Sequence, residues 1–180
     1  MSNPIQKVAL IGLSCLLSAM AEAAQTCQTA SIPATTPTSQ FTDNRNGTVT
    51  DKLTGLMWKK CSEGQAWDSN TNGCTGREAS YTWLEALKQA QTVNTSGGFA
   101  GFTDWRLPNI TELESLVEEQ CYDPAINLSV FPNTPSNYFW SSSPVAYNGY
   151  GAWYVGFDYG YDGWNHKSND LSVRLVRSGQ

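Results

Sequence analysis

The stretch from Tyr138 to Asp170 is the feature of this sequence that most restricts the folds open to it. It holds 11 of the 21 aromatic residues, mixed with Gly, Asn, Ser and Asp and with almost no aliphatic residue. That mixture is typical of binding surfaces, because Tyr and Trp give large contact area at low entropic cost while Ser, Gly and Asn give adaptable hydrogen bonding. The alternative is a Gly-rich β-meander whose aromatic residues form a core.

Strand periodicity separates the two interpretations for part of the stretch. Alternate side chains of a strand point to opposite faces, so in residues 153–158 one face carries Trp153, Val155 and Phe157, which we predict to be core. Beyond this segment the apolar period is lost and turn residues dominate. We therefore interpret residues 159–170 as an exposed loop, since long loops in compact domains are usually functional or disordered.

The first two dozen residues have the pattern of a secretory signal peptide. Lys7 precedes an apolar run, Val8–Met20, and the sequence Ala21-Glu22-Ala23 fits a small-x-small cleavage site. We expect the mature chain to begin near Ala24, with lipidation at Cys15 as the alternative. No other apolar run approaches the roughly 20 residues that cross a bilayer. The expected location is therefore the periplasm, the cell surface or the medium.

The charge balance limits the possible partners. The net charge is −5, and it stays at −5 when the signal peptide is removed. A mildly acidic chain is a poor candidate for nucleic-acid binding, which usually depends on a basic patch. The length suits one globular domain. We divide the chain into a signal peptide (1–23), a Thr/Pro-rich arm without charged residues (24–40) and a ligand-binding domain (41–180).

Four cysteines remain after the signal peptide is removed, an even number in an oxidising compartment. Cys61 and Cys74 flank a Gly/Asn/Ser-rich excursion, so we predict a disulfide between them, worth about 3 kcal/mol for a loop of roughly 15 residues. By elimination Cys27 pairs with Cys121. No CxxC or HxxxH spacing accompanies these cysteines, so we expect no metal site.

The segment after the arm predicts a β-hairpin and a further strand. Residues 41–44 and 48–51 flank Asn46-Gly47, a favoured pair for a type I′ turn. Residues 53–58 form the third short strand. Near the end of the chain, apolar and polar residues alternate over residues 171–177, which predicts another strand in a central position.

Two helices are predicted between these strands. Thr82 and Glu85 form a capping box before a helix over residues 83–93, and the sequence Gly97-Gly98 ends it. Its predicted apolar face consists of Trp83, Leu84, Leu87 and Gln91. A second helix follows Pro108, with Asn109 as its cap. Its predicted buried stripe is Ile110, Leu113, Leu116 and Val117, and its predicted solvated acidic face is Glu112, Glu114, Glu118 and Glu119.

Three sequence phrases resemble those of a known family. They are Gly55-Leu56-Met57-Trp58, the run 104–109 followed by Glu112-Leu113, and the run 139–143 together with 173–177. Together they resemble the Lcl C-terminal domain family over about residues 41–180. The resemblance implies a C-type-lectin-like fold of class α+β, with two helices packed on a small twisted antiparallel sheet, long irregular loops and one face given to ligand binding.

Two more distant similarities widen the functional alternatives. Arg106-Leu107-Pro108 and the run 173–177 are similar to the formylglycine-generating enzyme group, whose oxidases need a late cysteine pair and whose iron-dependent relatives use a histidine cluster. No cysteine follows Cys121 and His166 is the sole histidine, so we expect no enzymatic activity and no cofactor. An enzyme of this group that has lost its catalytic residues is the least favoured alternative. The chain also resembles variable proteins of diversity-generating retroelements, in which Asn codons near the C-terminus are rewritten.

The sequence therefore predicts an exported, non-enzymatic ligand-binding domain of receptor or adhesin type. Aromatic side chains would anchor the ligand and polar ones would set specificity. A protein partner is the first candidate, and a fixed glycan-binding adhesin is the second. Trp140 and Trp153 are assigned to the core beneath the site. The predicted site is one outward face that consists of Tyr147, Asn148, Tyr150, Tyr154, Asp158, Tyr159, Tyr161, Asp162, Trp164, Asn165, His166, Lys167, Ser168 and Asn169.

Overall fold

The computed structural model describes residues 24–179, and it confirms the α+β class. The predicted signal peptide and the alternative lipidation site at Cys15 lie outside the described residues. Two helices, α1 (Trp83–Thr95) and α2 (Ile110–Glu114), and a short 3₁₀ turn (Thr38–Gln40) accompany the strands. The strands are β1 (Thr26–Cys27), β2 (Phe41–Asp43), β3 (Thr48–Asp51), β4 (Leu56–Lys59), β5 (Ala66–Asp68), β6 (Gly73–Thr75), β7 (Ser80–Tyr81), β8 (Cys121–Tyr122), β9 (Tyr138–Pro144), β10 (Gly151–Gly156), β11 (Tyr161–His166), β12 (Leu171–Ser172) and β13 (Val176–Ser178).

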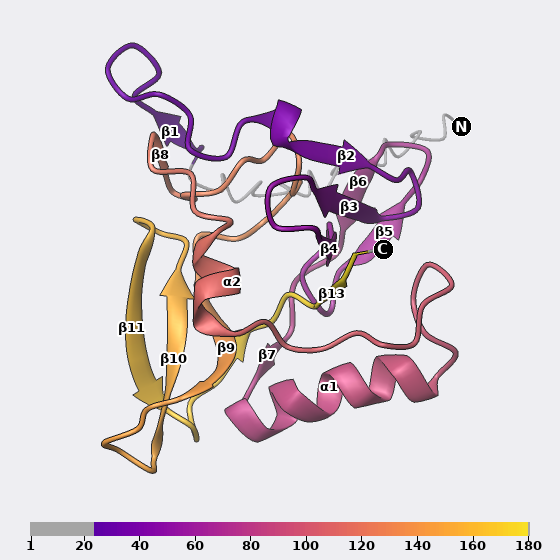
Figure 1. Cartoon of the computed structure of the whole chain (residues 1–180), viewed down its shortest axis with the longest axis vertical. Coiled ribbons are helices and arrows are strands. Elements are labelled where there is room, and N and C mark those ends of the chain that lie inside the picture. The colour runs from indigo at the N-terminus through magenta and orange to yellow at the C-terminus, as the bar shows by residue number, and fades with distance from the viewer. Residues whose placement is uncertain (1–23, 180) are drawn as a thin grey trace, which may run out of the picture.

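Two sheets form most of the molecule (Figure 1). The larger has the order β11-β10-β9-β12-β7, and the smaller has the order β13-β4-β3-β2. The pairing of β12 with β9 is parallel, whereas the other strand pairs are antiparallel. Two small strand pairs, β1 with β8 and β5 with β6, lie outside these sheets. The β10–β11 hairpin stands at one side of the molecule, with β11 outermost.

The alternating segment near the C-terminus contributes to both sheets. It was predicted as one central strand, but the structure divides it into β12 in the larger sheet and β13 at the end of the smaller one. The intervening residues Val173, Arg174 and Leu175 are fully buried. Between the two strands, the Glu63 amide donates to the Val173 carbonyl and the Lys59 amide to the Leu175 carbonyl. These backbone hydrogen bonds to residues 59 and 63 therefore hold the segment that connects the two sheets.

Helix α1 begins at the predicted capping box, in which Thr82 and Glu85 bond reciprocally. Its buried face differs from the prediction, because Ala86 and Ala90 are the buried residues whereas Leu84 is 57% exposed. Small residues let the helix axis approach the sheet closely, so the large side chains lie at the sides of the contact.

Helix α2 is shorter than its predicted apolar stripe, and its cap is as predicted. Asn109 and Glu112 form a capping box. Leu113 in the helix and Leu116 after it are fully buried, whereas Ile110 and Val117 are half-buried. The acidic residues after it do not all face solvent, which corrects the prediction for Glu118. Its carboxylate is buried and accepts hydrogen bonds from the backbone amides and hydroxyls of Thr35 and Thr36, at 2.9–3.1 Å.

The predicted β2–β3 hairpin is present with a different turn. The Asn44 amide donates to the Thr48 carbonyl, so three residues form the loop, and Arg45 and Gly47 have positive φ. The third strand is shorter than predicted, since β4 begins at Leu56, and Leu53 is exposed in the turn before it.

Both predicted disulfides are confirmed. Cys27 bonds to Cys121 across the β1–β8 pair, and Cys61 bonds to Cys74. The first bridge and the Glu118 carboxylate hold the arm against the segment after α2. No helix in residues 24–179 combines the length and apolarity needed to cross a bilayer.

Two clusters of buried side chains form the core. One contains Leu113 of α2 and the following Leu116 with Phe139, Val155 and Phe157. The other contains Ala86 and Ala90 of α1 with Trp140, Ala152 and the C-terminal segment. Because neighbouring residues of β9 and β10 belong to different clusters, α1 and α2 lie on opposite faces of the larger sheet.

Candidate functional site

The segment predicted as an exposed loop forms an edge strand. Residues 161–166 pair antiparallel with β10 in continuous register, from Gly156 opposite Tyr161 to Gly151 opposite His166. The segment is exposed as predicted, but it is not irregular. Exposure on both faces of β11 removes the apolar period that identifies most strands, because neither face is buried in a core.

The predicted site residues occupy four places on the β10–β11 hairpin. Tyr154, Tyr161 and Asn165 lie on one face, and Asp162, Trp164 and His166 lie on the other, as strand alternation requires. Asp158 and Tyr159 lie in the turn between the two strands. The remaining six lie at the opposite end, in the β9–β10 connection and after β11, namely Tyr147, Asn148, Tyr150, Lys167, Ser168 and Asn169. The prediction of one outward face is therefore wrong.

The first face carries a cluster of three tyrosines, which we call the tyrosine face. The rings of Tyr138 and Tyr154 stack at 4.8 Å between centroids, and Tyr161 meets them edge-on at 6.1 and 6.3 Å. The Tyr161 hydroxyl donates to the Tyr138 hydroxyl at 3.0 Å. This hydrogen bond raises the pKa of Tyr161 well above its usual value, so the Tyr161 hydroxyl stays protonated at neutral pH.

Tyr138 is a member of this face that the sequence prediction missed. Its register partner on β10 is Gly156, two residues from Tyr154, which places both rings on one face. A Cβ at Gly156 would lie 3.1 Å from the Tyr138 ring, and one at Gly163 would lie 2.7 Å from the Tyr154 hydroxyl. Each glycine thus gives a tyrosine ring room to lie across the neighbouring strand.

The second face of the hairpin adjoins α2. Burial and the charge of Asp162 raise the pKa of Glu114, which places these two carboxylates near each other. Trp164 is opposite Trp153 in the register and makes an edge contact with His166 at 5.9 Å. Trp153 was assigned to the core, but it is half-buried and belongs to neither core cluster, whereas Trp140 is fully buried as predicted.

The far end of the hairpin is anchored to α1 through Lys167. Its ammonium group donates to the Gly149 carbonyl at 2.9 Å and lies 4.5 Å from the centre of the Trp83 ring. Its carbonyl accepts from the Trp83 amide. Tyr147 and Tyr150 beside it are 76% and 79% exposed. Lys167 therefore positions the turn that displays these two tyrosines.

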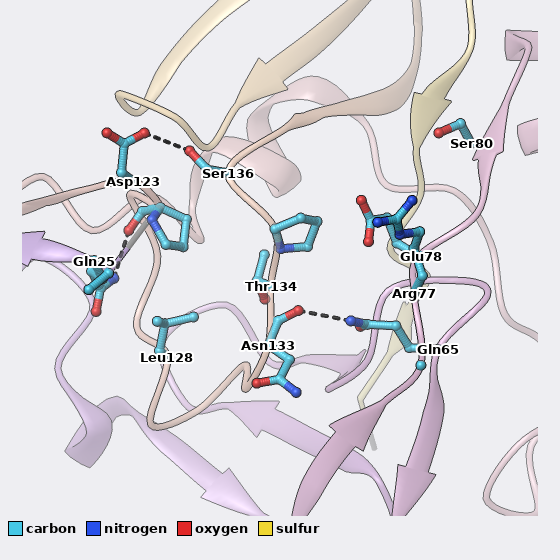
Figure 2. A pocket seen from close by; sticks show the side chains of 14 residues that line it. Gln25, Gln65, Arg77, Glu78, Ser80, Asp123, Leu128, Asn133, Thr134 and Ser136 are labelled. Carbon is cyan, nitrogen blue, oxygen red and sulfur yellow. Dashed lines mark hydrogen bonds between the residues drawn. The ribbon is translucent and has the colours of Figure 1, made fainter. Parts of the chain in front are cut away.

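A polar pocket of about 760 Å³ lies away from the hairpin faces and was not predicted. Figure 2 shows Arg77 and Glu78 on one side and Asp123 and Gln25 on the other, with Thr134 between them. Gln65 donates to the Asn133 carbonyl at 2.9 Å across the pocket wall. Its residues come from segments far apart in the sequence, so no local pattern could have identified it.

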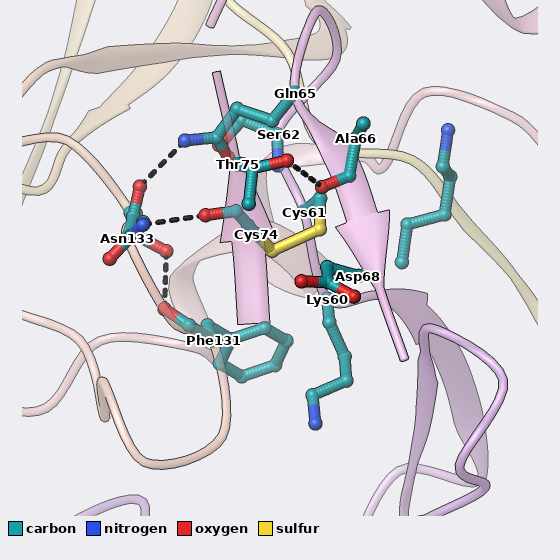
Figure 3. Close-up of a disulfide and its surroundings, with 12 residues drawn as sticks. Lys60, Cys61, Ser62, Gln65, Ala66, Asp68, Cys74, Thr75, Phe131 and Asn133 are labelled. Carbon is teal, nitrogen blue, oxygen red and sulfur yellow. Dashed lines mark hydrogen bonds between the residues drawn. A yellow bond between two sulfur atoms is a disulfide. The ribbon is translucent and has the colours of Figure 1, made fainter. Parts of the chain in front are cut away.

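The Cys61–Cys74 disulfide stabilises the wall of this pocket. Figure 3 shows Asn133 beside the disulfide, with its side-chain amide donating to the Cys74 carbonyl at 2.5 Å. Asn133 has a positive φ of 53°, a conformation that asparagine adopts more readily than most residues. The loop that carries Asn133 and Thr134 is thus held by the disulfide-bonded hairpin.

In residues 24–179 no three His, Cys, Asp or Glu side chains are grouped so as to hold a metal ion. The chemistry that the hairpin presents is instead aromatic contact area with hydroxyl, amide and carboxylate groups beside it. Such a surface is suited to recognising a ligand by contact.

The family comparison gives one match. The model of the family described as the Lcl C-terminal domain matches residues 47–177, which include both helices and the whole β10–β11 hairpin. A search of curated proteins finds no match.

Proposed function

The chain belongs to the Lcl C-terminal domain family, and we propose that it is an exported, non-enzymatic ligand-binding domain of C-type-lectin-like architecture whose binding surface is the β10–β11 hairpin. The observation that carries the proposal is the tyrosine face. Three tyrosine rings pack on the hairpin face that α2 does not cover, and Tyr161 is 40% exposed. The family relation supports export, and the two disulfides agree with it.

A protein is the ligand class that this surface fits best. The tyrosines stand on a sheet face, outside the pockets described above, and Tyr-rich surfaces of this kind are enriched at protein interfaces. Ring stacking fixes Tyr138 and Tyr154 before binding, so little side-chain entropy is lost when a partner covers them.

Replacing Tyr161 with alanine is expected to weaken binding at least tenfold, as loss of an interface hot spot does. Leu53→Ala is the control, because Leu53 is 80% exposed and lies in the turn before β4 rather than on the hairpin. The labelled chain is titrated against extracellular proteins and against a glycan array. Equal affinity of the Tyr161→Ala variant and the unaltered chain for the bound protein would contradict the proposed site.

A glycan is the second candidate, favoured by the polar pocket of Figure 2. Gln65, Arg77 and Ser80 line it, and such side chains can bond to sugar hydroxyl groups. In the same titration, glycan binding that Arg77→Ala abolishes and Tyr161→Ala leaves intact would assign the ligand to the pocket.

We also propose that the hairpin surface is diversified between relatives, as in the variable proteins of diversity-generating retroelements. Tyr147, Tyr150 and Tyr159 are mostly exposed, so replacing them costs little core packing. Sequencing this gene across many isolates should place substitutions in codons 147–170 at adenine positions, beside a reverse-transcriptase gene and a near-copy of the segment. Equal variation in codons 41–137 would contradict diversification and favour a fixed adhesin.

A further inference from the structure

The outer edge of β11 presents backbone groups that pair with no strand of residues 24–179. The Lys167 amide donates to the Tyr150 carbonyl, so these two residues form a hydrogen-bonded pair. Such pairs alternate along an antiparallel ladder, and the register is continuous. The backbone groups of residues 161, 163 and 165 therefore also point toward β10. Those of Asp162, Trp164 and His166 point outward. Exposed edges of this kind pair readily with another strand.

We propose that this edge pairs with β11 of a second copy of the same chain, antiparallel about a two-fold axis at Trp164, and so joins two five-stranded sheets. A pairing centred on Trp164 places Trp164 opposite its counterpart and Asp162 opposite His166 of the other copy. These are the three residues whose backbone groups point outward, so the register uses the outward-pointing groups of both chains.

The side chains agree with this register. Asp162, Trp164 and His166 share one face of the sheet, so two symmetry-related contacts between a carboxylate and an imidazole flank a pair of tryptophans. An imidazole N–H can donate to a carboxylate oxygen, and a polar pair directly across two strands stabilises their pairing. Trp164 is 40% exposed in the single chain, and its indole would lose part of that exposure on pairing. On the other face of the sheet, Gly163 of one copy lies opposite Asn165 of the other. Because glycine has no side chain, it does not obstruct the approach of the second strand.

The local contacts at His166 are compatible with pairing. Its carbonyl accepts from the Asn169 amide, and a carbonyl oxygen can accept a second hydrogen bond. Its amide bonds to the side-chain oxygen of Asn165, an intrachain contact that the other copy's carbonyl would replace. The pairing leaves the tyrosine face uncovered, so it does not depend on the proposed function.

Charge reversal with a compensating swap tests the register. Sedimentation equilibrium of the disulfide-bonded chain is expected to show a concentration-dependent dimer. His166→Glu sets two carboxylates opposite each other at both symmetric places and should weaken association about tenfold. Asp162→Lys removes the carboxylate that accepts from the imidazole and should weaken association as well. The double variant Asp162→Lys/His166→Glu sets opposite charges across the pair and should restore the dimer. A chain that stays monomeric at all concentrations would overturn the proposal.

Backbone substitution at the axis tests whether strand pairing makes the dimer. Trp164→Pro removes an outward N–H that β10 does not use, so the hairpin should persist while the dimer is lost. Trp164→Ala keeps that N–H and should retain more of the association, and circular dichroism checks the fold of both variants. If the dimer survives Trp164→Pro and also survives Asp162→Lys and His166→Glu, another surface forms the dimer and the proposal fails.

Discussion

Replacing Arg174 with methionine is expected to lower the free energy of unfolding by about 4 kcal/mol, because it leaves buried acceptors without a donor. The guanidinium is fully buried and donates to the Lys59 and Lys60 carbonyls and to the Thr134 hydroxyl. It lies 4.9 Å from the centre of the Phe131 ring. Burial lowers the pKa of Arg174 to about 9, so the group stays charged at neutral pH. Urea denaturation measures the loss.

Arg106→Met is the control for this prediction. Arg106 forms a two-pronged ion pair with Glu112, but its side chain is 42% exposed. Water replaces its contacts when the charge is removed, so a loss of about 1 kcal/mol is expected. Equal losses for the two variants would mean that burial does not determine the contribution of Arg174.

Replacing Glu118 with glutamine is expected to destabilise the protein by about 3 kcal/mol at pH 7, since several hydrogen bonds to a charged acceptor are weakened or lost. The amide nitrogen of glutamine cannot accept from the amide and hydroxyl of Thr36, both of which now bond to one carboxylate oxygen. The arm held by Thr35 and Thr36 should then become accessible to proteases. Urea denaturation and limited proteolysis measure these two effects.

The Glu118 prediction has a defined pH dependence. Burial alone would raise the pKa of this carboxyl, but hydrogen bonds from Thr35, Thr36 and Gln120 outweigh it and hold the pKa below its usual value. A group with a lowered folded pKa stabilises fully above its unfolded pKa, about 4.3, and loses that contribution as the pH falls through the folded pKa. The difference in free energy of unfolding between the Glu118→Gln variant and the unaltered chain should therefore become smaller at acid pH. A difference that stays constant from pH 7 to pH 3 would contradict this mechanism.

Local sequence signals predicted the elements whose structure is determined locally. Both capping boxes, at Thr82 and at Asn109, formed as predicted because their donors and acceptors lie three residues apart. The disulfides were predictable because only four cysteines remained to pair and two of them flanked one loop. The buried leucines in and just after α2 followed from helical period.

Several wrong predictions concerned residues whose surroundings are set by segments distant in sequence. Glu118 was placed on a solvated face because helical period contains no information about an arm 82 residues earlier that covers it. Leu84 was placed in the core, although only the packing of α1 on the sheet selects Ala86 and Ala90 instead. Strand β11 lacked an alternating pattern because both of its faces are largely exposed. Tyr138 was missed because its neighbours Tyr154 and Tyr161 meet it only through strand register.

The division of the C-terminal segment between two sheets affects when the protein can fold. Strand β12 lies between β9 and β7, and β13 completes the smaller sheet beside β4, roughly 120 residues earlier in the chain. The larger sheet cannot close before the ribosome has synthesised residue 172, nor the smaller sheet before residue 178. Contacts of such long sequence separation slow folding, because loop-closure entropy is lost before they form. Both sheets of a growing chain therefore stay open until β12 and β13 have been synthesised, which suits the export proposed above, because a translocation channel requires an unfolded chain.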